Sequence, residues 1–338
     1  MKQNIKAYSL TKLQELMEEL GLEPYRAQQV FQWLWQKNSI DFEKMTNLSK
    51  ILRKKLDDKF VIKNLLIVEC LKSGDDAKKY VFELEDKKRI EGVYIPEANR
   101  RTICVSTQVG CPLRCKFCAT GLYGFSRNLF AWEIANQIQL VQSDISTKPT
   151  NIVFMGMGEP LLNLSEVYNA LEILSSSIGL GISQRHITVS TAGIIDGMRE
   201  LLNSQFKVKL AISLNFADEE LRKEMMPVAE KNPLKEVLKI AREYSLRKEM
   251  VTFEYVMIKG LNDRLIDARR LVKLLKDIPS KVNLIPLNEY PGLPFKSPEP
   301  EAINKFRDFL YNFRHTVTIR KSKGQEILAG CGQLAVRT

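Results

Sequence analysis

The sequence predicts an α/β protein whose core is a parallel sheet. After residue 100, short apolar segments with strand character alternate with helical segments, as in proteins built from strand–helix units. The expected strands are 102–106, 151–155, 186–190, 208–214, 251–257, 282–287 and 315–320. Helices are expected between most of them, for example at 131–142, 164–176, 195–203 and 234–245. This alternation predicts an open or closed α/β barrel.

Four polar or glycine-containing stretches come at the ends of the first four expected strands. A cysteine-rich stretch follows the first strand, and GMGEP, STAG and SLNFAD come at the ends of the next three. Functional groups of parallel sheets gather at the carboxyl ends of the strands. We therefore expect the four stretches to share one rim.

The residues before 101 predict two further units. Residues 1–60 form a helical unit: the first helix has Ser9 as its N-cap and Gly21 as its stop signal, and two more helices follow. From 61 to 100 the pattern changes to short strands separated by turn residues, which predicts a β-rich linker segment before the core at 101–338. The helical unit is either a nucleic-acid contact or a plain packing unit.

The chain of 338 residues carries a formal net charge of +11 and a pI of about 9.2. An anionic partner such as nucleic acid fits this charge, although many proteins are mildly basic without binding one. No apolar run approaches the ~18 residues of a membrane span, and the first residues lack the apolar part of a secretory signal. The sequence thus predicts a cytoplasmic protein without membrane contact.

The stretch GCPLRCKFCATG places Cys111, Cys115 and Cys118 in a C-x3-C-x2-C pattern. A structural zinc site needs four ligands, and the two histidines, His186 and His315, do not form a ligand pair. Three thiolates on a short loop suit a 4Fe–4S cluster with one iron left open, and three purely structural cysteines are the alternative.

This pattern, with Phe117 before the last cysteine, resembles the signature of the radical S-adenosylmethionine (SAM) enzymes. The ordered stretches RIEGVYIP, CVSTQVGCPLRCKFCATG, GFSRNL, FMGMGEP, ITVSTAG, NLIPLN and AGCGQL narrow the resemblance to the RlmN/Cfr family of RNA adenine methyltransferases. The resemblance implies a partial (β/α)6 TIM-like barrel with a small N-terminal helical accessory domain. It also implies a 4Fe–4S cluster held by the three cysteines and two SAM molecules per turnover.

The same resemblance assigns catalytic roles. Cys331 would accept a methyl group from SAM, and Cys104 would resolve the enzyme–RNA link through a transient disulfide with Cys331. Glu91 would act as the base. The implied product is 2-methyladenosine at adenosine 2503 of 23S rRNA and adenosine 37 of some tRNAs. The residues expected to contact SAM are Gly158, Glu159, Ser190, Ser213, Leu214, Asn215 and Asn288. Many relatives have His at the place of Asn215.

The expected partners are 23S rRNA, tRNA and an electron donor such as flavodoxin, and we expect a monomer. The basic stretch RHTVTIRKSKGQ would contact RNA phosphates or be a solvated strand edge; its cations are Arg314, Arg320, Lys321 and Lys323. Cys70 has no motif partner and is expected to be structural. Two alternatives stay open: a C8-specific methyltransferase of the same family, and a non-catalytic, metal-stabilised RNA-binding protein.

Overall fold

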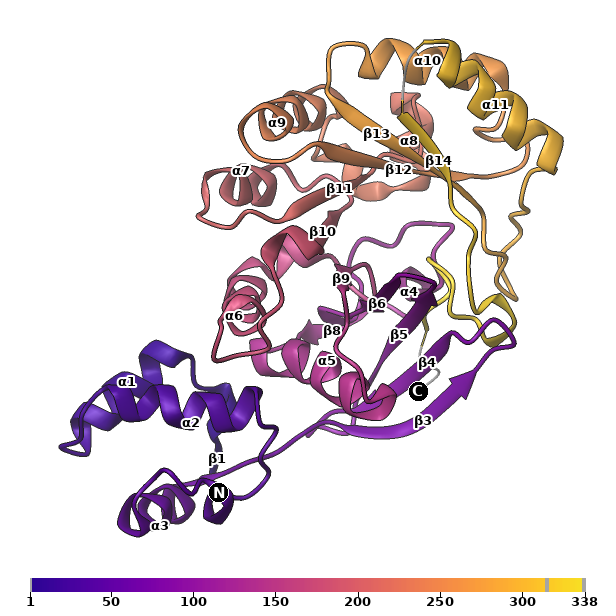
Figure 1. The fold of residues 1–338 in the computed structure, drawn as a ribbon. Helices are drawn as coiled ribbons and strands as arrows, with labels where there is room; N and C mark the ends of the chain where they lie inside the picture. The colour runs from indigo at the N-terminus through magenta and orange to yellow at the C-terminus, as the bar shows by residue number, and fades with distance from the viewer. Residues whose placement is uncertain (1, 314–315, 336–338) are drawn as a thin grey trace.

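The computed structural model of the chain describes residues 2–313 and 316–335. Its centre is one sheet in which ten strands of the described chain lie in the order β14-β13-β12-β11-β10-β9-β6-β5-β4-β3 (Figure 1). The strands from β6 to β14 in this order all run parallel to one another. Their bounds are β6 (Arg100–Cys104), β9 (Asn151–Phe154), β10 (Ile187–Thr191), β11 (Lys209–Ser213), β12 (Val251–Met257), β13 (Ser280–Pro286) and β14 (Thr316–Ile319). Each matches an expected strand to within two residues at its ends.

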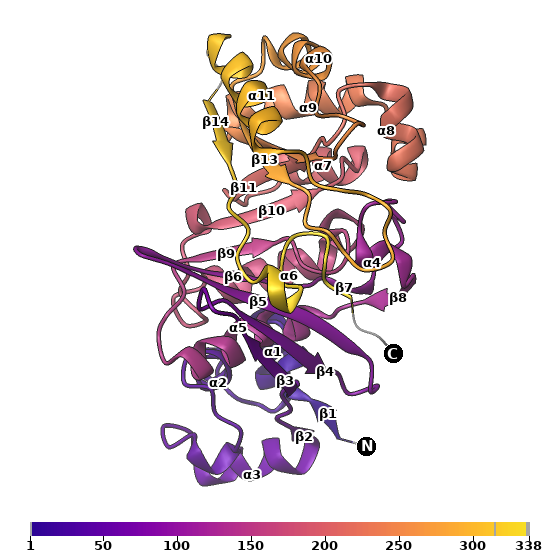
Figure 2. The ribbon, with the colours of Figure 1, turned by 90° about the vertical axis from the view of Figure 1, so that its right-hand side faces the viewer.

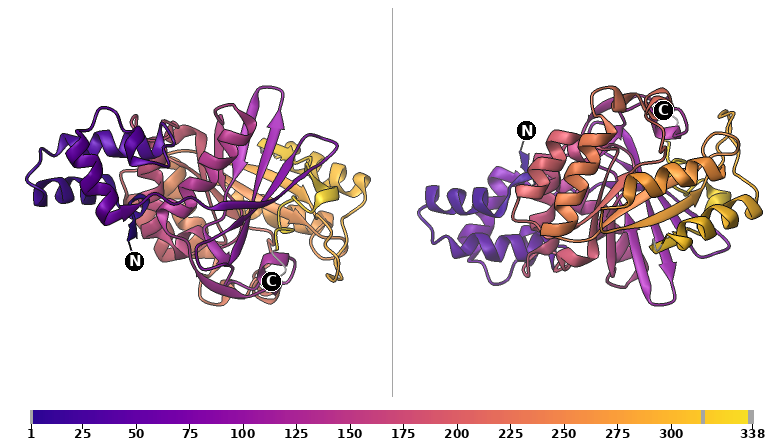
Figure 3. Two further views of the ribbon diagram at one scale, coloured as in Figure 1. Left: turned by 90° about the horizontal axis from the view of Figure 1, so that it is seen from below. Right: turned by 90° about the horizontal axis from the view of Figure 1, so that it is seen from above.

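Helices cover the outer side of the curved parallel sheet, as Figures 1 and 3 show. They follow the strands in the expected alternation: α5 (Ala131–Ile145), α6 (Leu164–Ser175), α7 (Ile195–Asn203), α8 (Glu219–Met225), α9 (Leu234–Arg247), α10 (Leu265–Leu275) and α11 (Pro300–Asn312). Val189, Ile212 and Phe253 on central strands are fully buried. Strands that are covered on both faces need such continuous apolar sequences, and this explains why they were recognisable.

The segment 61–100 extends the same sheet with antiparallel strands. The strands β3 (Leu66–Lys72), β4 (Lys78–Glu83) and β5 (Arg89–Glu97) pair in sequence, and β5 pairs with β6. The sequence-based division at residue 100 therefore does not coincide with an edge of the sheet. Cys70, expected to be structural, is exposed on the outermost strand β3.

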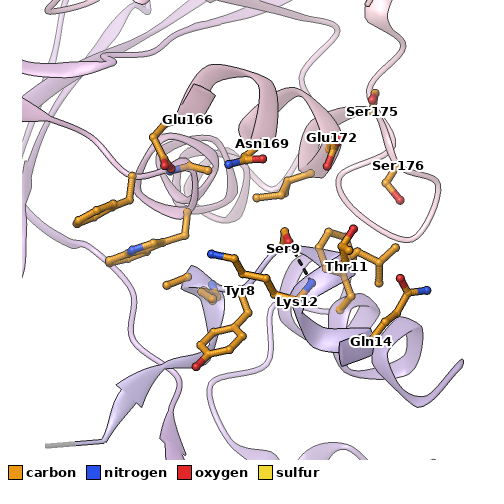
Figure 4. A pocket seen from close by; sticks show the side chains of 18 of the residues that line it. Tyr8, Ser9, Thr11, Lys12, Gln14, Glu166, Asn169, Glu172, Ser175 and Ser176 are labelled. Atoms are coloured by element: carbon orange, nitrogen blue, oxygen red, sulfur yellow. Dashed lines mark hydrogen bonds between the residues drawn. The ribbon is translucent and has the colours of Figure 1, made fainter. Parts of the chain in front are cut away.

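The N-terminal residues form a helical lobe beside α5 (Figures 1 and 2). It contains α1 (Leu10–Glu19), α2 (Tyr25–Trp35) and α3 (Lys50–Lys59), with β1 (Gln3–Asn4) paired in parallel to β2 (Phe60–Val61). Ser9 caps α1 as expected, because its hydroxyl accepts a hydrogen bond from the Lys12 amide. A cavity of about 770 Å³ separates α1 from α6, with Lys12 on one side and Glu166 and Glu172 on the other (Figure 4).

The remaining described elements are short. They are β7 (Gln108–Gly110), β8 (Phe125–Asn128), α4 (Ala119–Leu122) and the 3₁₀ turns Ile5–Ala7, Phe42–Lys44, Pro160–Leu162, Gln184–His186, Pro227–Glu230 and Gln325–Ile327. No helix in the described part of the chain is long and apolar enough to span a membrane.

Candidate active site

A cavity of about 170 Å³ opens at the carboxyl ends of the parallel strands. All four stretches expected at this rim contribute to its wall, through Cys111, Gly158, Ser190 and Asn215. Cys331, from the far end of the chain, lines the same cavity. The prediction of one shared rim is confirmed.

The cysteine-rich loop is held by a short hairpin that the sequence did not predict. The strands β7 and β8 pair in antiparallel fashion on either side of the loop, and the amide of Cys111 donates to the carbonyl of Gly124 at 2.8 Å. Gly110 has φ +77°, and a Cβ there would lie 1.9 Å from the Gly124 oxygen. Only glycine fits this position, so the glycine immediately before the first cysteine is a requirement of the loop.

Cys104 lies close to Cys331, which lines the cavity. Cys104 is buried at the end of β6, and Cys331 is half-buried on the loop that follows β14. Burial raises the pKa of Cys104 to about 12; the nearby Cys331 charge adds to this effect and the Arg320 charge opposes it. All six cysteines are free thiols. The structure thus brings the two cysteines into electrostatic contact without joining them.

Asn288 holds the Cys331 loop. Its side-chain amide donates to the Cys331 carbonyl at 3.0 Å, and its oxygen accepts from the Gln325 side chain at 2.9 Å. A Cβ at Gly330 would lie 2.7 Å from Asn288 Cγ, so the loop packs tightly on this residue. Asn288, expected as a SAM contact, therefore has both of its polar atoms occupied by the loop.

Glu91 lies on β5, outside the cavity lining. One carboxylate oxygen is 3.3 Å from Lys79 Nζ, and the other accepts from the Ala335 amide at 2.8 Å. Burial raises the pKa of Glu91, and the Lys79 charge partly opposes the shift. This raised pKa makes the carboxyl group a better proton acceptor once it is ionised.

The GMGEP loop presents Gly158 and Glu159 to the cavity. Gly158 has φ +101°, and a Cβ there would lie 2.5 Å from the Gln108 side chain. The Glu159 carboxylate accepts from the amides of Ala192 at 2.8 Å and Leu161 at 3.1 Å. Burial raises the pKa of Glu159 to about 7. Ser190 and Ser213 also line the cavity, whereas the buried Leu214 side chain does not.

Comparison with known proteins places this geometry in a family. Residues 105–272 match the radical SAM superfamily, and residues 3–62 match the ribosomal RNA large subunit methyltransferase N-terminal domain. The dual-specificity RNA methyltransferases RlmN of Pelobacter propionicus and Geobacter sulfurreducens are both 46% identical to the chain; each match spans 98% of this chain, and 96% and 91% of the respective relatives. The chain belongs to the RlmN family of radical SAM RNA methyltransferases.

A solved structure supports the same assignment. A radical SAM methyltransferase from Sphaerobacter thermophilus superposes with a TM-score of 0.91 at 37% identity, and the match covers 98% of this chain and 99% of that one. The expected fold class is therefore confirmed, and membership of the radical SAM superfamily implies a 4Fe–4S cluster and SAM as cofactors.

The donor set at the cavity fits the cluster of the RlmN family. Cys111, Cys115 and Cys118 offer three sulfur ligands. Burial raises the pKa of each thiol, to about 12 for Cys111, so all three are protonated without metal and must release protons on binding it. No three His, Cys, Asp or Glu side chains of the described residues are grouped to hold a single metal ion. Thiolates that ligate different irons of one cluster do not need such convergence.

Asn215, expected as a SAM contact, has a defined structural role. Its φ of +56° lies in the left-handed region, which Asn adopts more readily than most residues. Its side-chain oxygen accepts from the Val256 amide at 3.1 Å, and its own carbonyl accepts from Asn262 at 2.7 Å. The residue shapes the cavity wall through its backbone.

Sequence reasoning missed one arginine near the site and misplaced another. Arg320, expected on an RNA-contacting surface, lines the cavity, where the charges of Cys331 and Glu254 raise its pKa. Arg222 is fully buried behind the cavity wall. Arg314, expected as another RNA contact, lies outside the described residues. Arg222 carries no motif signal, because an arginine on an amphipathic helix ordinarily faces solvent.

Proposed function

We propose that this chain methylates C2 of adenosine in RNA, at adenosine 2503 of 23S rRNA and adenosine 37 of some tRNAs. The observation that carries the proposal is that Cys331 lines the same cavity as three further cysteines and lies close to the buried Cys104. A metal-binding module needs only the ligand cysteines. Two additional thiols beside the cavity are what a methyl carrier and its resolving partner require.

The target carbon explains why radical chemistry is needed. Adenine C2 lies between two ring nitrogens and is electron-poor, so it does not act as a nucleophile toward the methyl group of SAM. When bound, the cluster and SAM supply the methyl group and the 5′-deoxyadenosyl radical. Cys111, Cys115 and Cys118 would hold the cluster, and Gly158, Glu159, Ser190 and Ser213 would contact SAM.

Cys331 carries the methyl group on its sulfur and presents it to the adenine. Its place on a loop held by Asn288 keeps the sulfur at the cavity while the RNA base enters. The S-methyl group would first give up a hydrogen atom to the 5′-deoxyadenosyl radical, and its carbon would then bond to adenine C2 and link Cys331 covalently to the RNA. The adduct would return one electron to the oxidised cluster, and Glu91 would accept the C2 proton. The Cys104 thiolate would then attack the Cys331 sulfur, the bond from that sulfur to the new carbon would break, the carbon would take up a proton to become the methyl group, and the Cys104–Cys331 disulfide would remain. Reduction of the disulfide prepares the protein for another turnover.

The RNA would reach this site with help from the N-terminal lobe and the basic residues near Cys331. The net charge of +11 supports phosphate binding, and Lys321 is exposed beside the cavity loop. The relatives named above are RNA methyltransferases of dual specificity, which supports rRNA and tRNA as substrates. We further propose two SAM molecules per turnover, a monomer, a cytoplasmic location and a flavodoxin-like electron donor.

The test is an anaerobic assay of the cluster-loaded protein with SAM, a reductant and an RNA fragment, read by mass spectrometry of the nucleosides. We expect 2-methyladenosine. The appearance of 8-methyladenosine alone would assign the chain to the C8 group, and stoichiometric zinc without iron would support the non-catalytic RNA-binding alternative. Cys331→Ala should keep its iron and lose all methylation, whereas Cys115→Ala should lose the iron.

The resolving role of Cys104 has its own outcome. Cys104→Ala should complete the first carbon–carbon bond and stop there, leaving an RNA adduct on the peptide that contains Cys331. The adduct is visible as a shifted band on a denaturing gel and by peptide mass spectrometry. Cys70→Ala is the matched control, because Cys70 is exposed on β3, and it should turn over normally. Multiple turnovers by Cys104→Ala would contradict the role.

A further inference from the structure

Arg222 is a buried cation without an ion-pair partner among the described residues. It lies on α8, and its side chain is fully inaccessible to solvent. Its Nε donates to the Leu214 carbonyl at 3.3 Å and its Nη2 to the Ala192 carbonyl at 2.7 Å. Nη1 has no hydrogen-bond partner, and no carboxylate of the described residues forms an ion pair with the guanidinium. An uncompensated buried charge of this kind is strongly unfavourable.

The helix that carries Arg222 contacts the cysteine loop. The Met225 carbonyl, at the end of α8, accepts a hydrogen bond from the amide of Lys116 at 3.0 Å. Lys116 directly follows Cys115, and Cys115 packs against an apolar cluster that contains Met225 and Met226. The helix that carries Arg222 is therefore fixed to the backbone of the loop beside Cys115.

Electrostatics connect the same two residues. The Arg222 guanidinium and the Cys115 sulfur lie close enough for their charges to interact. Burial lowers the pKa of Arg222, and the charges of Glu219 and then of Cys115 oppose this shift. The nearest acidic side chain on α8, Glu219, directs both carboxylate oxygens at the Leu234 amide instead.

We propose that Arg222 is a positioning residue that supplies the counter-charge to the iron–sulfur cluster bound through Cys115 and thereby raises its reduction potential. The inference rests on the proposed role of Cys115 as a cluster ligand. Three thiolates on a 4Fe–4S core give a net negative charge, and one-electron reduction makes it more negative. A buried cation close to Cys115 stabilises the reduced state more than the oxidised state, and low solvent exposure keeps its effect unscreened.

The arginine also links the cluster to the SAM-binding loops. The two carbonyls that Arg222 holds belong to Ala192 and Leu214, directly after β10 and next to Ser213 at the end of β11. A Cβ at Gly193 would lie 3.3 Å from Nη2, so the backbone of this loop is packed on the guanidinium. The same side chain therefore fixes two loops that line the cavity. It also places its charge beside a third loop of the cavity, the cysteine loop.

The test is the midpoint potential of the cluster, measured by electron paramagnetic resonance during titration with titanium(III) citrate in the absence of SAM. Arg222→Gln keeps a hydrogen-bond donor and removes the charge. In Arg222→Gln, we expect the ratio of reduced to oxidised cluster at a fixed potential to fall about tenfold. This corresponds to a midpoint potential that is lower by ~59 mV for a one-electron couple. Arg222→Lys keeps the charge and should stay close to the unmodified protein.

Lys223→Gln is the matched control, because it removes a charge from the neighbouring residue, whose ammonium is partly exposed and paired with Glu220. A potential of Arg222→Gln equal to that of this control overturns the inference. If Arg222→Gln takes up no iron, Arg222→Lys decides the question. An unchanged midpoint potential in Arg222→Lys supports the role of the charge. A tenfold fall in its ratio of reduced to oxidised cluster at a fixed potential overturns the inference. Absence of a cluster from the unmodified protein would instead refute the proposed function.

Discussion

At the scale of single residues, burial decides the protonation of the site. The three loop cysteines and Cys104 are all held as thiols by desolvation in the protein without cofactor, while Glu91 and Glu159 are held closer to neutrality than exposed carboxyl groups. In the proposed reaction, the cysteines and Glu91 have to lose their protons to act. A cation beside three of these groups opposes the effect of burial: Arg320 at Cys104, Lys79 at Glu91 and Arg222 at Cys115.

The pair of Glu91 and Lys79 gives a pH prediction. Glu91 must be ionised to accept the C2 proton, so the rate rises as pH increases through its pKa. Lys79 lowers this pKa against the effect of burial. Lys79→Met should therefore move the acidic limb of the single-turnover rate to higher pH, by about one unit.

The measurement is a pH profile of adduct formation and release in a single turnover. Lys78→Met is the control on the neighbouring position of β4, because Lys78 pairs with Asp144 and not with Glu91. An acidic limb that stays in place in Lys79→Met, or moves equally in the control, would show that Glu91 is not the base.

Residue roles were predictable from sequence where the signal is local. The spacing of the loop cysteines and the glycines around Cys331 are local features, which can be read directly from the sequence. The partners of these residues are not: Arg320 reaches Cys104 only because β14 lies on the same curved sheet as β6, and Arg222 reaches Cys115 only through the packing of α8. The occupied side chains of Asn288 and Asn215 equally depend on contacts distant in sequence.

At the scale of elements, the helical lobe is joined to the core by a buried polar network. Lys6 Nζ donates to Asn64 at 2.5 Å and to Gln139 on α5 at 2.6 Å, and Asn136 donates to both of the same acceptors. Gln139 then donates to the last carbonyls of α2, those of Leu34 and Trp35, at 2.9 Å each. One side chain of α5 thus bonds two parts of the lobe.

Gln139→Leu should loosen the lobe. It leaves the α2 carbonyls unpaired and removes an acceptor from the buried Lys6, which costs about 3 kcal/mol. Hydrogen exchange of the α2 amides should accelerate, whereas α9 stays protected. Gln142→Leu, on the same helix, is the control, because the Gln142 oxygen has no partner among the described residues and the substitution should change stability by less than about 0.5 kcal/mol.

Equal protection of α2 in the two variants would show that apolar packing alone holds the lobe. The expected three helices of this lobe were predictable, because the apolar spacing of each helix and the capping serines of α1 and α3 are local sequence features. The mode of attachment was not, because Lys6, Asn64 and Gln139 lie in three separate segments and none belongs to a motif.

At the scale of the whole molecule, the sheet is an open barrel whose two edge strands are bridged by hydrogen bonds. The edges β14 and β3 do not pair with each other in the described sheet. The turn between β3 and β4 instead binds the loop that carries Cys331: the Gly324 amide donates to the Asp75 carboxylate at 3.0 and 3.2 Å, and Lys323 donates to the Asp75 carbonyl at 3.1 Å. The Gly74 amide also donates to the Glu326 carboxylate.

This clamp shows why the segment 61–100 could not be assigned from sequence. Short alternating strands with polar turns look like a linker, and their role depends on a loop more than 240 residues later in the chain. The β-rich segment holds the loop of Cys331 at the cavity through these hydrogen bonds. The clamp therefore couples the edge of the fold to the position of Cys331.

Removal of the clamp should release this loop. Burial alone would raise the pKa of Asp75, but hydrogen bonds from Ser73, Gly324 and Ala77 hold this pKa below its usual value. The carboxylate therefore stays ionised at a more acidic pH than an ordinary aspartate. Asp75→Ala should raise the rate of Cys331 alkylation by iodoacetamide about tenfold, because the loop opens more often after losing bonds worth about 1.4 kcal/mol.

Peptide mass spectrometry measures the rate, with exposed Cys70 as the internal reference. Asp76→Asn is the control, since it removes the charge that pairs with Lys72 at the surface while Asn tolerates the φ of +66° at this position, and it should leave the rate unchanged. Equal labelling of Cys331 in both variants would mean that Asn288 holds the loop without the turn.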